Sequence, residues 1–224
     1  MSFGCEFCHR EFRRESSVLV HMCEPKRRRL ERSERGVQLG FQAYVRFYEI
    51  TQGSARTKTF EDFCDSAYYR AFVKWGRYCV ATRVINPTQW LEWLLKHNRK
   101  IDQWARDQQY EEFLMDYVRR EAADDALARA VEWSISWSET NSAPAHDCLR
   151  YGNHNAICHA IVTGRLTAWA IYNSESGQKL LTQLGPEQIT MIWPWIDTDF
   201  WQRRFRELPA DQALAQHTMS EAGW

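Results

Sequence analysis

The sequence predicts an all-α protein: a multi-helix globular domain with a small metal-binding module at its N-terminus. Apolar residues recur at helical spacing from residue 37 onward, and strand patterns are scarce. Three Cys and two His residues crowd the first 23 positions. The chain of 224 residues is long enough to bury a core, and its eleven Trp and eleven Phe residues supply apolar area for one.

The N-terminal module is expected from the spacing of its cysteines and histidine. Two residues separate Cys5 from Cys8, twelve separate Cys8 from His21, and Cys23 follows almost at once. Three thiolates and one imidazole suit a closed tetrahedral Zn²⁺ site, so one structural zinc ion is predicted. We expect a helix that begins near Glu15 to supply His21 as a ligand and to fray at about that residue. Because so short a segment buries too little surface to fold alone, the ion would supply the folding energy.

This segment resembles the Cys2His2 zinc-finger family. The likeness runs through the cysteine pair, Phe12, Val18 in place of the usual Leu, and His21. The family's fourth ligand lies three to five residues after its first His, where this chain has the unsuitable residues 25–27. Cys23 is the nearest candidate, which makes the module a Cys-Cys-His-Cys variant.

Sequence-specific reading of DNA by this module alone is not favoured. The resemblance implies that Arg14, Ser17 and Val20 occupy the base-contacting positions. Arg14 can pair with guanine, whereas Val20 has no polar reach. Leu19 and Val20 also form an apolar edge, which suits docking against protein.

A basic run follows the last predicted ligand, with six Lys and Arg residues within positions 26–35. One interpretation is a strip that contacts phosphates. The other is a solvated linker or helix start in which Arg27 pairs with Glu31. The nucleic-acid contacts predicted on the first interpretation are Arg13, Arg14, Lys26, Arg27, Arg28 and Arg29.

Three segments are predicted: the zinc finger at 1–24, a basic linker at 25–36 and the helical domain at 37–224. The first 40 residues carry nine Lys and Arg against six Glu, and the chain as a whole is neutral. A local basic surface is therefore expected rather than a global one.

Capping signals place the helices of the large domain. Thr59, Asn86 before proline and Asn153 are expected to begin helices, residues 52–54 to end one, and Pro194 to stop another. The tryptophans, including those near residues 90, 133 and 193, are expected in the core. Predicted helices span 67–81, 110–119, 124–137, 153–164, 178–184, 187–193, 197–206 and 210–217.

Residues 23–28, 68–74 and 163–166 carry a second resemblance. Over nearly its full length the chain is similar to an uncharacterised family of T4-type tailed bacteriophages. The family has no assigned activity. The resemblance implies a phage protein that acts in a bacterial cytoplasm.

A second cluster of Cys and His residues raises the alternatives of a second metal site and of a Cys–His nucleophile pair. No paired spacing and no orienting acid at recognisable spacing support either, so buried cysteines and capping histidines are the simpler interpretation. No nucleotide-binding loop or carboxylate cluster is evident, so a non-enzymatic protein is favoured and no small-molecule substrate is predicted. The cluster contains His146, Cys148, His154, Cys158 and His159.

The leading functional hypothesis is a zinc-finger protein that binds nucleic acid, DNA foremost and with weak sequence specificity. It would recruit or regulate a protein of the replication or transcription machinery. The alternative is a protein–protein adaptor or assembly factor whose finger docks on a protein. No apolar run of eighteen residues occurs, so no membrane span is expected. The odd count of seven Cys and the lack of an apolar signal region predict a cytoplasmic location.

Overall fold

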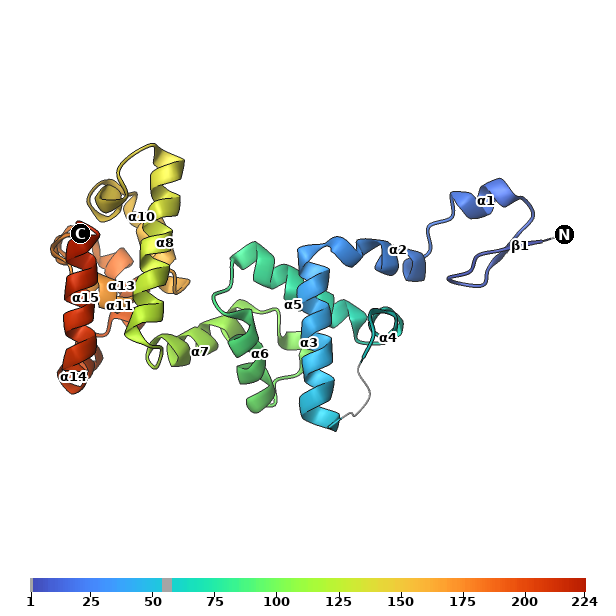
Figure 1. Ribbon diagram of the computed structural model, residues 1–224, viewed down its shortest axis with the longest axis horizontal. Coiled ribbons are helices and arrows are strands. Elements are labelled where there is room, and N and C mark those ends of the chain that lie inside the picture. The colour runs from blue at the N-terminus through green and yellow to red at the C-terminus, as the bar shows by residue number, and fades with distance from the viewer. Residues whose placement is uncertain (1, 54–57) are drawn as a thin grey trace. The chain divides into compact units, whose positions relative to one another are not determined.

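The computed structural model describes residues 2–53 and 58–224 (Figure 1). In the described part, the regular strands are the two-residue pair β1 (Phe3–Gly4) and β2 (Glu11–Phe12), which run antiparallel. The remaining regular structure is helical, which confirms the predicted all-α class with a small N-terminal module.

The chain divides into two compact units, residues 1–109 and 110–224. The predicted boundaries at 1–24, 25–36 and 37–224 stay a prediction. The helices of the first unit are α1 (Glu15–Leu19), α2 (Glu24–Leu30), α3 (Arg35–Gln52), α4 (Phe60–Asp65), α5 (Tyr69–Thr82) and α6 (Pro87–Lys96), with 3₁₀ turns at Glu31–Ser33 and Ile101–Gln103.

Helix α7 (Asp107–Val118) starts at the end of the first unit and continues into the second. The helices that follow it are α8 (Ala123–Asn141), α9 (Cys148–Tyr151), α10 (His154–Val162), α11 (Ala168–Tyr172), α12 (Glu175–Gln183), α13 (Pro186–Ile196), α14 (Thr198–Glu207) and α15 (Pro209–Glu221), with a 3₁₀ turn at Ala145–Asp147. No helix in the part of the chain that the structure describes has the length and apolar character needed to cross a bilayer.

The predicted caps begin the helices at the expected places. Thr59 forms a reciprocal capping box with Asp62 at the start of α4, since each side chain accepts from the other's backbone N–H. Asn86 accepts from the backbone of Gln89 at 3.2 Å, and Asn153 caps α10. Gly53 ends α3 in the left-handed conformation, while Ser54 lies outside the described residues.

Two expectations about residues 193 and 194 are wrong. Pro194 was predicted to stop its helix, but α13 continues through it to Ile196. A proline this close to a helix end removes only one backbone hydrogen bond, so the last turn survives it. Trp193 was expected in the core, yet it is 47% exposed, whereas Trp90 is fully buried.

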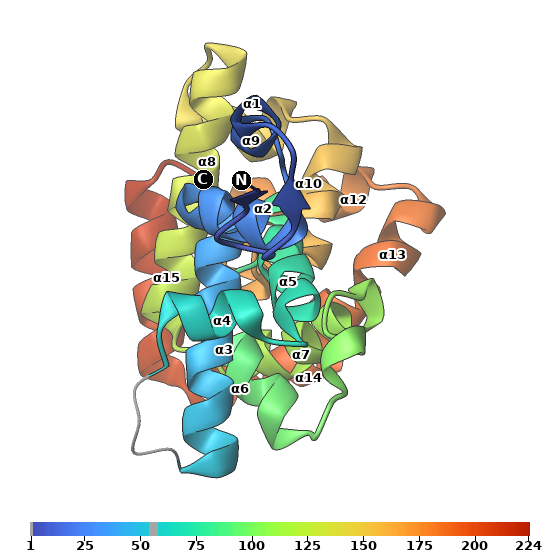
Figure 2. The same cartoon turned by 90° about the vertical axis from the view of Figure 1, so that its right-hand side faces the viewer.

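Helices α3 and α5 lie side by side in the first unit (Figure 1 and Figure 2) and approach closely at three glycines. Gly36 and Gly40 of α3 face Gly76 of α5. A Cβ atom added at Gly76 would lie 2.0 Å from the carbonyl oxygen of Gly36 and 2.7 Å from the backbone nitrogen of Gly40. The backbones therefore touch directly, and this contact fixes the position of α5 in the unit.

An aromatic core closes around that contact. Trp75, Trp90 and Trp104 are at most 2% exposed. The Trp75 ring lies against those of Trp90 and Trp104, and the Trp104 ring also lies against Phe72. The second unit has a separate apolar core built around Trp169, which α8, α10 and α14 help to cover. Each unit thus has fully buried tryptophans in a core of its own.

Candidate metal centre and adjoining basic surface

The four predicted metal ligands come from three short segments of the N-terminal module. Cys5 and Cys8 lie in the turn between β1 and β2, where the Cys5 amide donates to Arg10 and the His9 amide donates back to Cys5. His21 follows α1, which begins at Glu15 as predicted and ends at Leu19, two residues before the ligand. Cys23 occupies the N-cap position of α2, without a capping hydrogen bond from its side chain.

The structure brings these four side chains together. The ligand atoms of Cys5, Cys8, His21 and Cys23 all lie within 4.8 Å of one another. The Sγ atoms of Cys5 and Cys23 are 3.9 Å apart, and Cys8 Sγ lies 3.3 Å from His21 Nε2. Zinc–sulfur bonds of about 2.3 Å give a tetrahedral sulfur–sulfur edge of about 3.8 Å. The four side chains are therefore close enough together to hold a metal ion.

Packing and hydrogen bonds support the ligand geometry. The ring of Phe12 lies against the imidazole of His21, with 4.8 Å between centroids. The backbone N–H of Phe7 donates to the Cys5 thiol and lowers its pKa, which favours the thiolate that a metal needs. Cys5 is buried, and the other three ligands are half-buried.

The predicted basic residues fall into two sets. Arg28, whose side chain is 19% exposed, donates to the carbonyl of Cys64 at 2.7 Å and to Glu24 at 2.6 Å, and its guanidinium lies over the ring of Tyr69. The Nη2 atom of Arg29 donates to both carboxylate oxygens of Asp65, at 3.0 and 3.2 Å. These contacts attach α2 to α4 and α5.

Three of the other four predicted contacts, Arg13, Arg14 and Arg27, face solvent more fully. Arg13 and Arg14 are exposed, and neither makes an ion pair within the described residues. The Arg27 side chain is 59% exposed and lies 3.7 Å from Glu31, so the predicted ion pair is present. Lys26 is half-buried and donates to the carbonyl of His21 at 3.4 Å, so the strip begins directly beside a candidate metal ligand.

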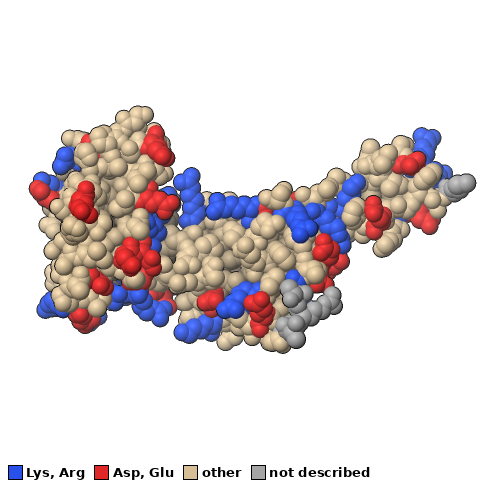
Figure 3. Space-filling view, viewed as in Figure 1, with Lys and Arg blue, Asp and Glu red and all other residues tan. Residues whose placement is uncertain are grey.

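Charge is divided sharply between the two units. Residues 1–109 contain 20 Lys and Arg against 13 Asp and Glu, a net charge of +7. Residues 110–224 contain 9 against 16, a net charge of −7. In the first unit, Lys and Arg side chains gather over α2 and α5 (Figure 3). The neutral total of the chain conceals this opposition.

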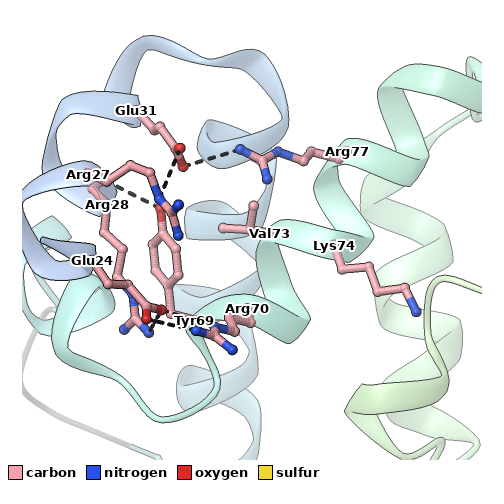
Figure 4. A pocket seen from close by; sticks show the side chains of 9 residues that line it. All are labelled: Glu24, Arg27, Arg28, Glu31, Tyr69, Arg70, Val73, Lys74 and Arg77. Carbon is pink, nitrogen blue, oxygen red and sulfur yellow. Dashed lines mark hydrogen bonds and ion pairs between the residues drawn. The ribbon is translucent and has the colours of Figure 1, made fainter. Parts of the chain in front are cut away.

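A groove of about 430 Å³ lies between α2 and α5, and five cations line it (Figure 4). Three of them come from α5, and sequence reasoning missed them. Their spacing of four and three residues, which places side chains on one helix face, was the signal that could have revealed them. We call this feature the α2–α5 groove; its cations are Arg27, Arg28, Arg70, Lys74 and Arg77.

Two glutamates of α2 and the turn after it also line the groove. Glu24 accepts from Arg70 at 2.7 and 3.0 Å and from Arg28, and these hydrogen bonds lower its pKa to about 2. Glu31 lies 3.2 Å from Arg77. Burial raises the pKa of Tyr69 to about 12, so the phenol is a neutral wall of the groove.

The second cluster of Cys and His residues does not assemble. Across residues 2–53 and 58–224, the group in the N-terminal module is the one set of three or more potential ligands that lies close together. Cys148 and Cys158 are fully buried in the apolar core of the second unit. Burial raises the pKa of both thiols, which is the opposite of what a nucleophile or metal ligand requires.

Comparison with known proteins found no match. No protein-family model, curated protein or solved structure matches the chain.

Proposed function

We propose that the protein is a non-enzymatic zinc protein that binds nucleic acid through its first unit. One zinc ion bound by Cys5, Cys8, His21 and Cys23 folds the N-terminal module. The binding is electrostatic and weakly sequence-specific, with DNA as the foremost ligand. The phage origin and the bacterial cytoplasm implied by resemblance stay predictions.

The donor set supports zinc over other metals. Thiolate ligands select soft or borderline ions, and a group of four protein ligands leaves no open position for substrate. The separation of 3.9 Å between the Cys5 and Cys23 sulfurs matches the edge of a zinc tetrahedron. Because four protein ligands leave no open position, we assign the ion a structural role and not a catalytic one.

The net charge of +7 on residues 1–109 is the observation that carries the nucleic-acid proposal. A concentrated positive field attracts the phosphate backbone without regard to base sequence. Arg13, Arg14 and Arg27 are the phosphate contacts because they are exposed, and the half-buried Lys26 joins them because it lies beside Arg27 in the strip. Arg28 and Arg29 hold α2 in place for them.

The second unit has a different task in this proposal. Its net charge of −7 repels phosphate, which leaves it to contact a protein of the replication or transcription machinery. The chain would then recruit or regulate that machinery at the nucleic acid.

Fluorescence anisotropy of a labelled oligonucleotide, measured against salt concentration, tests the nucleic-acid proposal. The variant Arg13→Ala/Arg14→Ala/Lys26→Ala/Arg27→Ala removes four phosphate contacts. Each contact contributes about 0.9 to the slope of log K against log salt for duplex DNA, so the slope should fall by about 3 to 4. A slope and affinity equal to the wild type would reject the proposal.

A matched control removes charge from the second unit. Arg203 and Arg206 are exposed on α14. The variant Arg203→Ala/Arg206→Ala should leave the salt slope unchanged, because the proposal assigns no phosphate contact to the second unit.

Protein docking by the finger is the second candidate function. Leu19 is 73% exposed, Val20 is 82% exposed and Met22 is 58% exposed, so an apolar edge surrounds the end of α1. A pull-down that survives nuclease treatment, is lost on Val20→Glu and persists in the control Met191→Glu would favour this function. Met191 is 47% exposed on the second unit.

A further inference from the structure

We propose that the α2–α5 groove is a second phosphate-binding site, in which Lys74, Arg70 and Arg77 hold successive phosphates of a nucleic-acid strand. The inference rests on the proposed function and adds a site to it. Neither the finger nor the basic run contains these three α5 residues.

The three cations share one face of α5. They are spaced by four and three residues, which places them in a row on the helix surface. At 1.5 Å per residue, the row is about 10 Å long. A row of this length, extended by long side chains, can reach neighbouring phosphates of one strand. The groove beside it is open enough, at about 430 Å³, to admit a backbone.

Lys74 is the cation of the row whose charge is not paired with a carboxylate of the described residues. It is exposed and makes no ion pair within the described residues. In Figure 4 its side chain extends away from Glu24 and Glu31. An ammonium without a protein partner loses no intramolecular contact when it binds a phosphate.

The two arginines of the row form ion pairs with glutamates of the same unit. Arg70 pairs with Glu24, while Arg77 pairs with Glu34 at 2.6 Å and with Glu31 at 3.2 Å. The side chains of Arg70 and Arg77 are 74% and 49% exposed, so these pairs are worth little in water. A phosphate oxygen pair can replace a carboxylate in the same bidentate geometry.

The glutamates therefore compete with the ligand for the arginines. Glu24, Glu31 and Glu34 face the five groove cations, which leaves a net charge of +2. Removal of one competing carboxylate should strengthen binding. A purely structural network predicts the opposite sign, because loss of Glu31 would only loosen Arg77.

Anisotropy titrations of the zinc-loaded full chain test the site, with a labelled single-stranded 20-mer and the matching duplex as probes. Lys74→Ala should lower affinity about five- to eightfold at 0.1 M salt and reduce the salt slope by about 0.7 to 0.9. Glu31→Gln should raise affinity about two- to fivefold, the size of one exposed charge interaction. The control Lys96→Ala removes an exposed charge of α6, outside the groove, and should change neither.

The outcomes separate the groove from the finger. If Arg13→Ala/Arg14→Ala weakens binding while Lys74→Ala behaves like Lys96→Ala, the groove proposal is overturned and the proposed function stands. A Glu31→Gln variant that is folded by circular dichroism and binds no more tightly than wild type also overturns it. If the wild type binds neither probe, both proposals fall.

Discussion

Replacement of Arg28 by alanine should destabilise the first unit far more than replacement of its neighbour Arg27. Arg28 donates hydrogen bonds at 2.7 Å to Cys64 and 2.6 Å to Glu24, and its guanidinium centre lies 4.6 Å from the centroid of the Tyr69 ring. A hydrogen bond from a charged donor contributes about 1.5–3 kcal/mol. A partly buried cation–π contact adds about 0.5–1 kcal/mol. The Glu24 side chain is 34% exposed, so that ion pair is screened by water and adds little. The part-buried bond to Cys64 and the ring contact together give an expected loss of about 2–4 kcal/mol.

Urea unfolding, followed by circular dichroism and tryptophan fluorescence, measures this loss. With a slope of about 2 kcal/mol per molar urea, the midpoint of the first unit should fall by roughly 1–2 M in Arg28→Ala. Arg27→Ala removes one exposed pair with Glu31 and should change stability by less than about 0.5 kcal/mol. The reasoning is refuted if Arg28→Ala keeps wild-type stability and instead weakens oligonucleotide binding more than Arg27→Ala does.

Two further predictions concern the packing and pH dependence of the first unit. Gly76→Ala should lower stability by about 3 kcal/mol or more, because its Cβ would lie 2.0 Å from the backbone of Gly36. Gly4→Ala, which meets nothing within 4 Å, is the matched control in thermal unfolding; equal melting temperatures would contradict the α3–α5 contact. The hydrogen bonds from Arg70 and Arg28 hold the pKa of Glu24 at about 2 in the folded state, so its contribution is present above the ordinary value of 4.5 and is lost as pH falls from 4.5 toward 2. The stability difference between wild type and Glu24→Gln should shrink over that range, and a constant difference would show that Glu24 does not titrate in this way.

Local signals in the sequence were enough to find most helix starts. Thr59, Asn86 and Asn153 each satisfy backbone N–H groups within three residues, so their effect depends on near neighbours alone. Pro194 misled because a proline's cost depends on its distance from the helix end, and α13 ends only two residues later. The exposure of Trp193 depends on which helix faces are covered, which periodicity alone does not reveal.

The candidate site was predictable where its parts lie close in the chain. Cys5, Cys8, His21 and Cys23 fall within 19 residues, and their spacing identifies a metal group without tertiary information. The α2–α5 groove joins residues 24–31 to residues 69–77, and nothing in the sequence indicates that these two segments meet.

The basic run contains cations that hold α2 in place and cations that face solvent. The sequence does not separate the two kinds, because the difference depends on contacts with residues distant in the chain. Arg28 and Arg29 look identical to Arg27 in the sequence, yet Cys64 and Asp65 of α4 capture them in the fold. Charge clustering predicts a basic surface, but only tertiary structure separates the cations that hold a helix from those that face solvent.

The metal content of freshly purified, reduced full-length protein, combined with hydrogen exchange before and after chelation, tests the central claim most directly. We expect one zinc ion per chain. After chelation, the amides of Cys5 and His9, which are bonded in the turn between β1 and β2, should lose protection while α3 and α5 keep theirs. Protein that contains no stoichiometric zinc, or a turn that stays protected after the metal is removed, would contradict the account.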